Sequence, residues 1–202
     1  MRRSNEERVF DLKRIIVRRL EELDLEARMN WLNSEEIYVN VPIDVPVSLN
    51  DTKKWFSQNA LNQSRKDFAF VIDEEQGQSL ISMSGLVGID YRNRRAELYM
   101  FMNPKFIARG LGTLVLRWLC NYGFTEMGLN KIFLLTVESN SRARTFYERN
   151  AFVLEGTLKK HQWHRGKFVD RFIHGLLFSD WKEQTWATEA PPSFEIPILD
   201  QK

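Results

Sequence analysis

The stretch "NPKFIARGLGTLVLRWLC", residues 103–120, decides how this chain of 202 residues folds. It leads from a strand-like apolar run into a second apolar run with helical spacing. Gly110 and Gly112 stand at the junction, beside Arg109. One apolar stripe follows along the predicted helix and consists of Leu111, Leu114, Val115, Trp118, Leu119 and Tyr122. The pattern predicts a strand that turns into a helix through a glycine-containing loop.

This junction has the chemistry of a phosphate site. The first N–H groups of a helix lack intrahelical partners and, together with the helix dipole, attract an anion. Glycine lets the backbone come close to phosphate oxygens, and Arg109 adds positive charge. A turn that only starts a helix would look the same. A dinucleotide-binding fingerprint is excluded because its third glycine would fall on Val115, and no Walker loop fits.

The composition indicates a globular protein, with 43% hydrophobic and 28% charged residues. The formal net charge of +2 gives no reason to expect nucleic acid or an anionic membrane as a partner. The single cysteine, Cys120, lies within the helical pattern and is interpreted as a packed thiol in a reducing compartment. The N-terminus lacks the apolar stretch of a signal peptide, and no apolar run approaches the about 18 residues that span a bilayer. We therefore expect a cytoplasmic protein.

The first half of the chain predicts a strand, two helices and an antiparallel meander. Residues 12–20 are rich in β-branched side chains, and Leu23, Ala27, Trp31 and Leu32 recur at helical spacing. Residues 34–47 are expected to form an irregular loop. Ser48 and Asp51 form a capping-box pattern for a helix that ends near residue 62. Three strands then follow, separated by short turns: residues 67–73, 79–91 and 94–102.

After the junction, the pattern predicts a strand at residues 130–138 and a helix at 139–150 capped by Ser139 or Asn140. A hairpin of residues 152–164 and 167–178 turns at Arg165 and Gly166. The expected fold class is α+β, with a mixed, mostly antiparallel central sheet flanked by helices. Residues 1–181 form one domain, and residues 182–202 are expected to be an irregular tail, either disordered or an arm onto a partner.

Three of these blocks together resemble the GNAT superfamily of acetyl-CoA-dependent N-acetyltransferases. They are the Gly110-Leu111-Gly112 turn, the helix with Asn140, Ala143 and Tyr147, and the closing hairpin. The resemblance is strongest to the ribosomal-protein N-terminal and spermidine acetyltransferases, and it extends over residues 12–181. It implies the acyl-CoA N-acyltransferase fold and transfer of acetyl from acetyl-CoA to a primary amine, with no metal. The resemblance does not choose among a peptide N-terminus, a polyamine and an amino sugar as the acceptor. It also leaves open whether the protein forms a homodimer.

The resemblance also implies which residues hold the coenzyme. The backbone around the turn would cradle its pyrophosphate and comprises Ile107, Ala108, Arg109, Gly110, Leu111, Gly112 and Thr113. Phe101 and Met102 would pair with the pantetheine amides as a strand does. Asn140 and Arg142 would contact the coenzyme, and Tyr147 would lie beside the thioester sulfur. Two positions depart from the family: Ile107 replaces a usual Gln or Arg, and Ala151 replaces a usual glycine, so Asn150 is expected to take the left-handed conformation.

Two proton transfers are needed, because an amine attacks only as its free base and a thiolate leaves better when protonated. The implied acid is the phenol of Tyr147. Glu97 is the preferred base, because strand alternation places it on the face of Tyr99 and Phe101. A solvated Glu97 paired with Arg94 or Arg95, a role for Glu138 and a water route all stay open. Cys120 is in the wrong place for a covalent intermediate, which favours a ternary complex.

Side chains for acceptor selection are expected on the first helices, their loop and the last hairpin. They are Trp31, Glu35, Glu36, Tyr38, Asp44, Trp55, His161 and Trp163. His161 and His164 do not predict a metal site, because residues three apart on a strand point to opposite faces. A non-catalytic acyl-CoA-binding or interaction protein is the competing class, and the presence of both Asn140 and Tyr147 argues against it.

Overall fold

The computed structural model describes residues 14–41, 43–74, 77–107, 110–190 and 192–198. Short helical turns at Glu22–Asp24, Pro104–Phe106 and Tyr122–Glu126 connect the main elements. In chain order these elements are β1 Arg14–Arg19, α1 Leu25–Leu32, α2 Glu35–Tyr38, α3 Leu49–Asn59, β2 Arg65–Glu74, β3 Gly77–Asp90, β4 Arg95–Met102, α4 Leu111–Asn121, β5 Lys131–Val137, α5 Ser141–Glu148, β6 Val153–His164, β7 Lys167–Leu177, α6 Phe178–Lys182 and β8 Glu195–Pro197. None of the helices in the described ranges has the length and apolarity to cross a bilayer.

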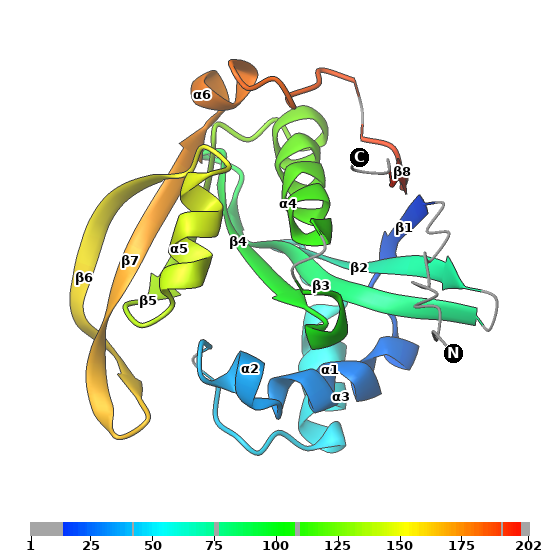
Figure 1. Ribbon diagram of the computed structural model, residues 1–202, viewed down its shortest axis with the longest axis vertical. Coiled ribbons are helices and arrows are strands. Elements are labelled where there is room, and N and C mark those ends of the chain that lie inside the picture. The colour runs from blue at the N-terminus through cyan, green and yellow to red at the C-terminus, as the bar shows by residue number, and fades with distance from the viewer. Residues whose placement is uncertain (1–13, 42, 75–76, 108–109, 191, 199–202) are drawn as a thin grey trace, which may run out of the picture.

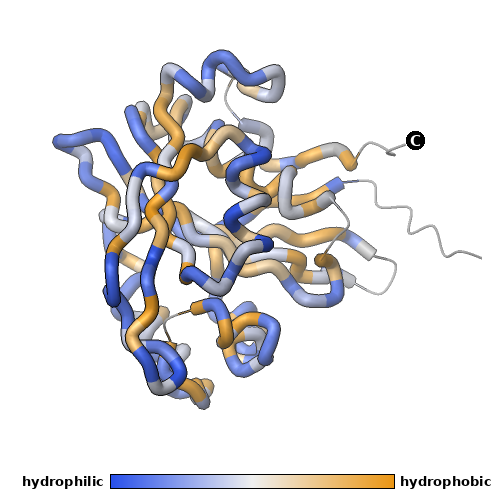
Figure 2. The backbone as a smooth tube through the Cα atoms, turned by 60° about the vertical axis from the view of Figure 1, so that its left-hand side comes forward, coloured by the Kyte–Doolittle hydropathy of each residue, from blue (hydrophilic) through white to orange (hydrophobic). Residues whose placement is uncertain are grey.

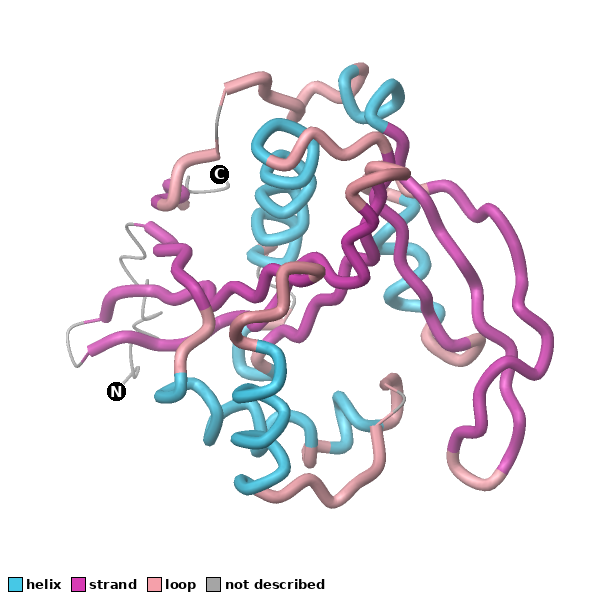
Figure 3. Tube along the Cα trace, turned by 180° about the vertical axis from the view of Figure 1, so that it is seen from behind, coloured by secondary structure: helices cyan, strands magenta, loops and turns pink. Residues whose placement is uncertain are grey.

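One sheet of eight strands organises the molecule, in the order β6-β7-β5-β4-β3-β2-β1-β8. Every neighbouring pair is antiparallel except β4 and β5. Helix α4 covers one face of the β1–β4 half, and α1 to α3 lie below the other face (Figure 1). The view from behind shows the same two layers (Figure 3).

The alternation of side chains along β2 explains these two layers. Phe68 and Phe70 pack in the larger core with Trp118 of α4, and their rings meet the indole edge-to-face at 4.9 and 5.5 Å. Ala69 points the other way, into a smaller core with Trp31 and other residues of the α1–α3 side. Apolar residues run along the inner strands and the faces of the helices that cover them (Figure 2). Strands β1–β4, covered on both faces, form a rigid base for a site beside β4.

The sheet splits between its two parallel strands. β4 pairs with β5 only from Arg95 to Glu97, opposite Lys131 to Phe133. Beyond Glu97 the two strands diverge, and β5 continues with β7 through Val137 (Figure 1). Beyond Glu97 the backbone N–H and carbonyl groups of β4 and β5 no longer pair with each other, so the split leaves an opening in the middle of the sheet.

Most expected elements are present, with differences in the segment before the meander. The capping box of Ser48 and Asp51 is confirmed, with two reciprocal hydrogen bonds of 3.1 Å, and α3 ends at Asn59. The segment expected to be an irregular loop contains helix α2. Leu23 was expected on the apolar stripe of the first helix, but it is 70% exposed, because a separate turn precedes α1.

The described part of the tail is more ordered than expected. Strand β8 pairs with β1 at the end of the sheet, from Glu195 to Pro197. The indole N–H of Trp118 donates a hydrogen bond to the carbonyl oxygen of Ser193 over 2.6 Å, and the Phe194 ring meets the same indole at 5.7 Å. The tail is therefore an arm onto the chain's own sheet and helix α4.

Candidate active site

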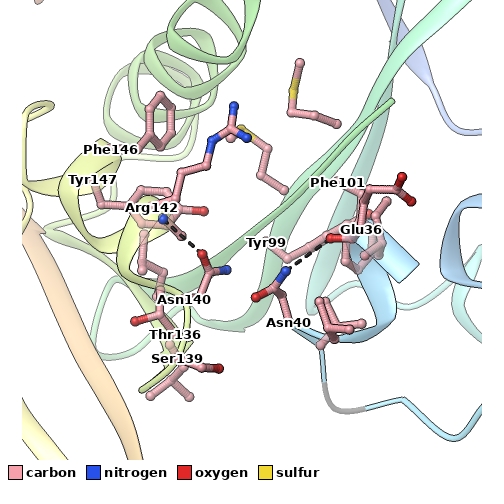
Figure 4. A pocket seen from close by; sticks show the side chains of 18 of the residues that line it. Glu36, Asn40, Tyr99, Phe101, Thr136, Ser139, Asn140, Arg142, Phe146 and Tyr147 are labelled. Carbon is pink, nitrogen blue, oxygen red and sulfur yellow. Dashed lines mark hydrogen bonds between the residues drawn. The ribbon is translucent and has the colours of Figure 1, made fainter. Parts of the chain in front are cut away.

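A cavity of about 1500 Å³ fills the opening between β4 and β5. Five parts of the chain line it: β4 from Glu97 onward, the start of α4, the segment from β5 into α5, helix α2, and the β6–β7 hairpin. Figure 4 shows side chains from β4, α2 and α5 converging on this space. Glu97 and Tyr147 lie on its two sides, one on β4 and the other on α5.

The turn into α4 has the geometry that glycine allows. Gly110 is the N-cap with φ 74° and ψ −14°, a left-handed conformation that costs other residues energy. Gly110, Gly112 and Thr113 line the cavity, as does Ile107. Leu111 is 2% exposed and belongs to the core. Ala108 and Arg109 lie outside the described residues.

The end of β4 presents one backbone edge to the cavity. The N–H of Asn103 donates to the carbonyl oxygen of Ile81 over 2.9 Å. Because the pairs of an antiparallel ladder alternate, Phe101 and Met83 form the next hydrogen-bonded pair, and the backbone groups of Met102 face away from β3. Phe101 and Met102 both line the cavity, but only Met102 offers free backbone groups toward the split.

Helix α5 starts at the cavity with Asn140, which confirms Asn140 over Ser139 as the cap. Its side-chain oxygen accepts a hydrogen bond from the N–H of Ala143 over 3.0 Å (Figure 4). Arg142 lines the cavity. The helix ends differently from the expectation: Ala151 has the left-handed conformation, with φ 68°. Asn150 instead donates a side-chain hydrogen bond of 2.9 Å to the carbonyl oxygen of Phe146.

Tyr147 is held firmly on this helix. Its ring packs edge-to-face against Phe146 at 5.2 Å and Phe152 at 5.8 Å, and the residue is 8% exposed. Burial raises the pKa of the Tyr147 phenol, and the neighbouring Cys120 raises it further. Cys120 itself is fully buried, and burial raises the pKa of its thiol. At neutral pH both groups keep their protons, so Tyr147 can donate one.

Glu97 stands at the vertex where β4 and β5 separate. Burial raises the pKa of Glu97, while the positive charge of Arg171 acts in the opposite direction. The expected alternative partners are elsewhere, because Arg94 donates to the carbonyl oxygen of Gly128 and Arg95 lies 3.5 Å from Asp90. The sequence did not predict Arg171 as a site residue because this residue lies on β7, across β5 from Glu97. The available sequence indication was that Arg171 lies two residues after Val169 on a strand, so both side chains point to the same, buried face.

The end of the cavity where the acceptor was expected lies between α2 and the hairpin. Glu35, Glu36 and Glu138 line it, together with Arg165 and Lys167. His164 joins the two sides, since its Nε2 lies 2.8 Å from the carbonyl oxygen of Val39. A carbonyl oxygen only accepts, so Nε2 carries a proton.

Of the eight side chains expected to select the acceptor, Glu35 and Glu36 line the cavity. Trp31 is buried in the smaller core, and Trp55 stacks under Arg28, whose guanidinium lies 3.8 Å from the ring centroid. Trp163 is 61% exposed and meets Phe168 on the outer face of the hairpin, so it is not a wall of the site. Among the described residues no group of three His, Cys, Asp or Glu side chains is arranged to hold a metal ion.

A smaller cavity of about 550 Å³ adjoins the first one between α4 and α5. The two cavities share Thr113, Arg142 and Phe146. The smaller one also has Arg117 and Arg149 in its lining, and no acidic residue. Three guanidinium groups without a carboxylate make a local site for an anion, although the whole chain carries only +2.

Comparisons with known proteins agree with this geometry. The family model for the acetyltransferase (GNAT) domain matches residues 14–153. The spermidine N(1)-acetyltransferase of Escherichia coli (strain K12) is 28% identical over 127 residues, which are 63% of this chain and 64% of that protein. The putative ribosomal N-acetyltransferase YdaF of Bacillus subtilis (strain 168) is 30% identical over 52% of this chain and 57% of that protein. The matches thus span less than two thirds of these two relatives.

Solved structures extend the likeness over more of the fold. The spermidine N-acetyltransferase from Vibrio cholerae, in complex with CoA and spermine, superposes with a TM-score of 0.74. The sequence identity is 25%, and the match covers 82% of this chain and 96% of that one.

Proposed function

Because the chain belongs to the GNAT acetyltransferase family and has its fold, we propose that it transfers acetyl from acetyl-CoA to a primary amine. The observation that carries this proposal is the cavity in the split of the sheet. It brings a half-buried carboxylate, Glu97, and a protonated phenol, Tyr147, to one space beside the glycine turn of α4. These are the groups that aminolysis of a thioester needs.

The coenzyme would lie along the split, with its pyrophosphate at the start of α4. Backbone N–H groups of residues 107–113 would hold the phosphates. The left-handed Gly110 supports this role, because it is the N-cap of α4 and has no side chain that would keep a phosphate away from the backbone. Met102 would pair through its backbone with the pantetheine arm, with the Phe101 side chain alongside. Asn140 and Arg142 would flank the arm from α5.

The adjoining basic cavity supports the same orientation. Coenzyme A carries a third phosphate on its adenosine ribose, beyond the pyrophosphate. Arg117, Arg142 and Arg149 line the smaller cavity, whereas Tyr147 lines only the larger one. A coenzyme placed this way would put its charges at the basic end and its thioester beside the phenol.

In the reaction, Glu97 would accept the proton of the incoming ammonium group, directly or through water. The free amine then attacks the thioester carbonyl, a C–N bond forms and the C–S bond breaks. Tyr147 would donate its proton to the departing sulfur, which leaves as a thiol. The attacking nitrogen loses its second proton as the C–S bond breaks, and this proton would return to the Tyr147 phenolate directly or through water. The buried, protonated Cys120 supports direct transfer without a cysteine intermediate. Glu138 or water stays the alternative base.

The names of two relatives, a spermidine acetyltransferase and a putative ribosomal acetyltransferase, support two acceptor classes. A polyamine and a peptide N-terminus are therefore the first acceptors to test, with an amino sugar next. We place the reaction in the cytoplasm, because this compartment contains acetyl-CoA and keeps a free thiol such as that of Cys120 reduced.

The test is release of free thiol from acetyl-CoA in the presence of an amine panel, with each product identified by mass spectrometry. We expect thiol release that depends on the amine, and a product heavier by one acetyl group. Binding of acetyl-CoA without transfer to any amine would instead favour a non-catalytic acyl-CoA-binding protein.

A further inference from the structure

Charges of both signs line the acceptor end of the cavity, on different walls. The carboxylates of Glu35 and Glu36 come from α2, and the cations of Arg165 and Lys167 come from the hairpin turn. All four side chains are exposed. None of them forms an ion pair within the ranges that the structure describes. Each charge can therefore meet a charge of a ligand.

A second pair of opposite charges lies deeper, where Glu97 faces Arg171. One Nη of Arg171 donates to the carbonyl oxygen of Leu135 over 2.9 Å. Its Nε is buried and has no hydrogen-bond partner among the described residues, and the same holds for the hydroxyl of Thr136, which also lines the cavity. Buried donors without partners are costly, so a ligand that accepts hydrogen bonds here is favoured.

An acceptor with positive charges alone satisfies only half of this arrangement. The ammonium groups of a polyamine suit Glu35, Glu36 and Glu97 but are repelled by the hairpin cations. Like charges facing each other across an interface disfavour a partner. A molecule with one amine and one anion satisfies both walls.

We propose that the preferred acceptor is an amine that carries an anionic group, a carboxylate or a phosphate, in the same molecule. The amine lies toward Glu97 and the α2 carboxylates, and the anion lies toward Arg171, Arg165 and Lys167. This inference rests on the proposed acetyl transfer and narrows its acceptor class.

The experiment compares acceptors that differ only in the anion. Two peptide amides with a free N-terminus carry Asp or Asn as the second residue. O-phosphoethanolamine is compared with ethanolamine, and spermidine is the polycation. For the wild-type protein we expect kcat/KM to be on the order of tenfold higher for the anionic member of each pair. The reason is that only this member can form a charge-assisted hydrogen bond with the cationic side chains. The pair with the larger ratio identifies carboxylate or phosphate as the anion.

Variants then locate the effect. Arg171→Gln and the exposed Lys167→Gln should each reduce the ratio toward one, and Lys167→Gln removes a surface charge with little risk to folding. The matched control is Lys159→Gln, on the same hairpin but paired with Asp170 at 2.7 Å and outside the cavity lining. Its ratio should equal that of the wild type.

Equal rates for both members of each pair, or a higher kcat/KM for spermidine, would overturn the inference. Calorimetric titration with acetyl-CoA keeps the two proposals apart. If acetyl-CoA binds and spermidine is acetylated fastest, the acetyltransferase proposal stands and the charged-acceptor inference fails. If acetyl-CoA does not bind, the acetyltransferase proposal fails first.

Discussion

Ser82 donates its hydroxyl hydrogen bond to the main-chain carbonyl oxygen of Phe101 over 3.0 Å, from the neighbouring strand. Its oxygen also lies 2.6 Å from the hydroxyl oxygen of Ser84, and both serines are fully buried. The last residues of β4 are thereby fixed to β3, while their other edge faces the split. This arrangement holds one wall of the cavity rigid without help from β5.

Ser82→Ala should lower the free energy of unfolding by about 1–3 kcal/mol, because it leaves the buried Ser84 hydroxyl without its partner. Ser82→Ala/Ser84→Ala should cost less than the sum of the two single changes, since the orphaned hydroxyl is gone. Urea unfolding of the three variants measures this. Strict additivity would mean that the two hydroxyls do not depend on each other.

Gly110→Asp should abolish the thermal shift that acetyl-CoA produces, because it adds a side chain and a negative charge at the start of α4. Gly88→Asp is the matched control. Gly88 also has a left-handed φ, 58°, with nothing within 4 Å of an added Cβ, and it is absent from the cavity lining. Both variants should lose some stability, but only Gly110→Asp should lose the coenzyme shift. An unchanged shift in Gly110→Asp would put the phosphate site elsewhere.

Glu97→Gln should lower turnover at neutral pH and much less at high pH, where the amine loses its proton unaided. Burial raises the pKa of Glu97 above its ordinary value, so the folded protein binds this proton more tightly than the unfolded chain. The stability contributed by the protonated form is full below the ordinary pKa and is lost as pH rises through the raised one. The neutral Gln avoids this loss.

Glu97→Gln is therefore expected to be less active and slightly more stable than the wild type at neutral pH. The stability difference should shrink in acid, as measured by thermal unfolding across a pH series. Glu138→Gln serves for comparison, as the alternative base on the opposite side of the split. Parallel pH–rate profiles of Glu97→Gln and wild type would exclude Glu97 as the base.

Tyr147→Phe should retain acetyl-CoA binding and lower kcat by about 10²–10⁴-fold, the usual contribution of a positioned general acid. The ring contacts with Phe146 and Phe152 are kept, so packing should change little. The loss falls on kcat because the hydrogen bond to sulfur strengthens as the C–S bond breaks.

The control is Tyr122→Phe, where the ring stacks on Trp118 outside the cavity lining, and single-turnover kinetics should show wild-type transfer. A Tyr147→Phe protein within twofold of the wild type, with chemistry rate-limiting, would assign the proton to solvent.

Arg149→Gln should weaken acetyl-CoA binding and reduce its preference over acetyl-3′-dephospho-CoA. The guanidinium lies in the adjoining cavity with Arg117 and Arg142, where a phosphate has no competing carboxylate. Arg92→Gln, in the exposed turn between β3 and β4, should leave the affinity ratio unchanged. Calorimetry gives the affinity of each variant for both coenzymes. If Arg149→Gln weakens the binding of both by the same factor, the ribose phosphate does not bind in this cavity.

Local patterns predicted much of this structure. The apolar stripe of α4, the meander of β2 to β4 and the Asn140 cap all depend on residues close together in the chain. The candidate site was also predictable in part: strand alternation fixes the face of Glu97, the family resemblance implies Tyr147, and both line the cavity.

What could not be predicted depends on distant partners. The four-residue helix α2 is too short for a periodic pattern. Arg171 meets Glu97 only because β7 lies beside β5, and the irregular pairing of the hairpin between Leu158 and Gln162 depends on both of its strands. The split between β4 and β5 is a property of the sheet, since it appears only where their pairing stops after Glu97.

The pairing of β8 with β1 has a consequence for biosynthesis. Glu195 pairs with Ile16, so nearly the whole domain must leave the ribosome before this edge of the sheet is covered. Until then the backbone groups on the outer edge of β1 can pair with a strand of another nascent chain. A chaperone that shields β1 during this interval would raise the yield of folded protein, and release of the nascent chain before residue 195 would favour its aggregation.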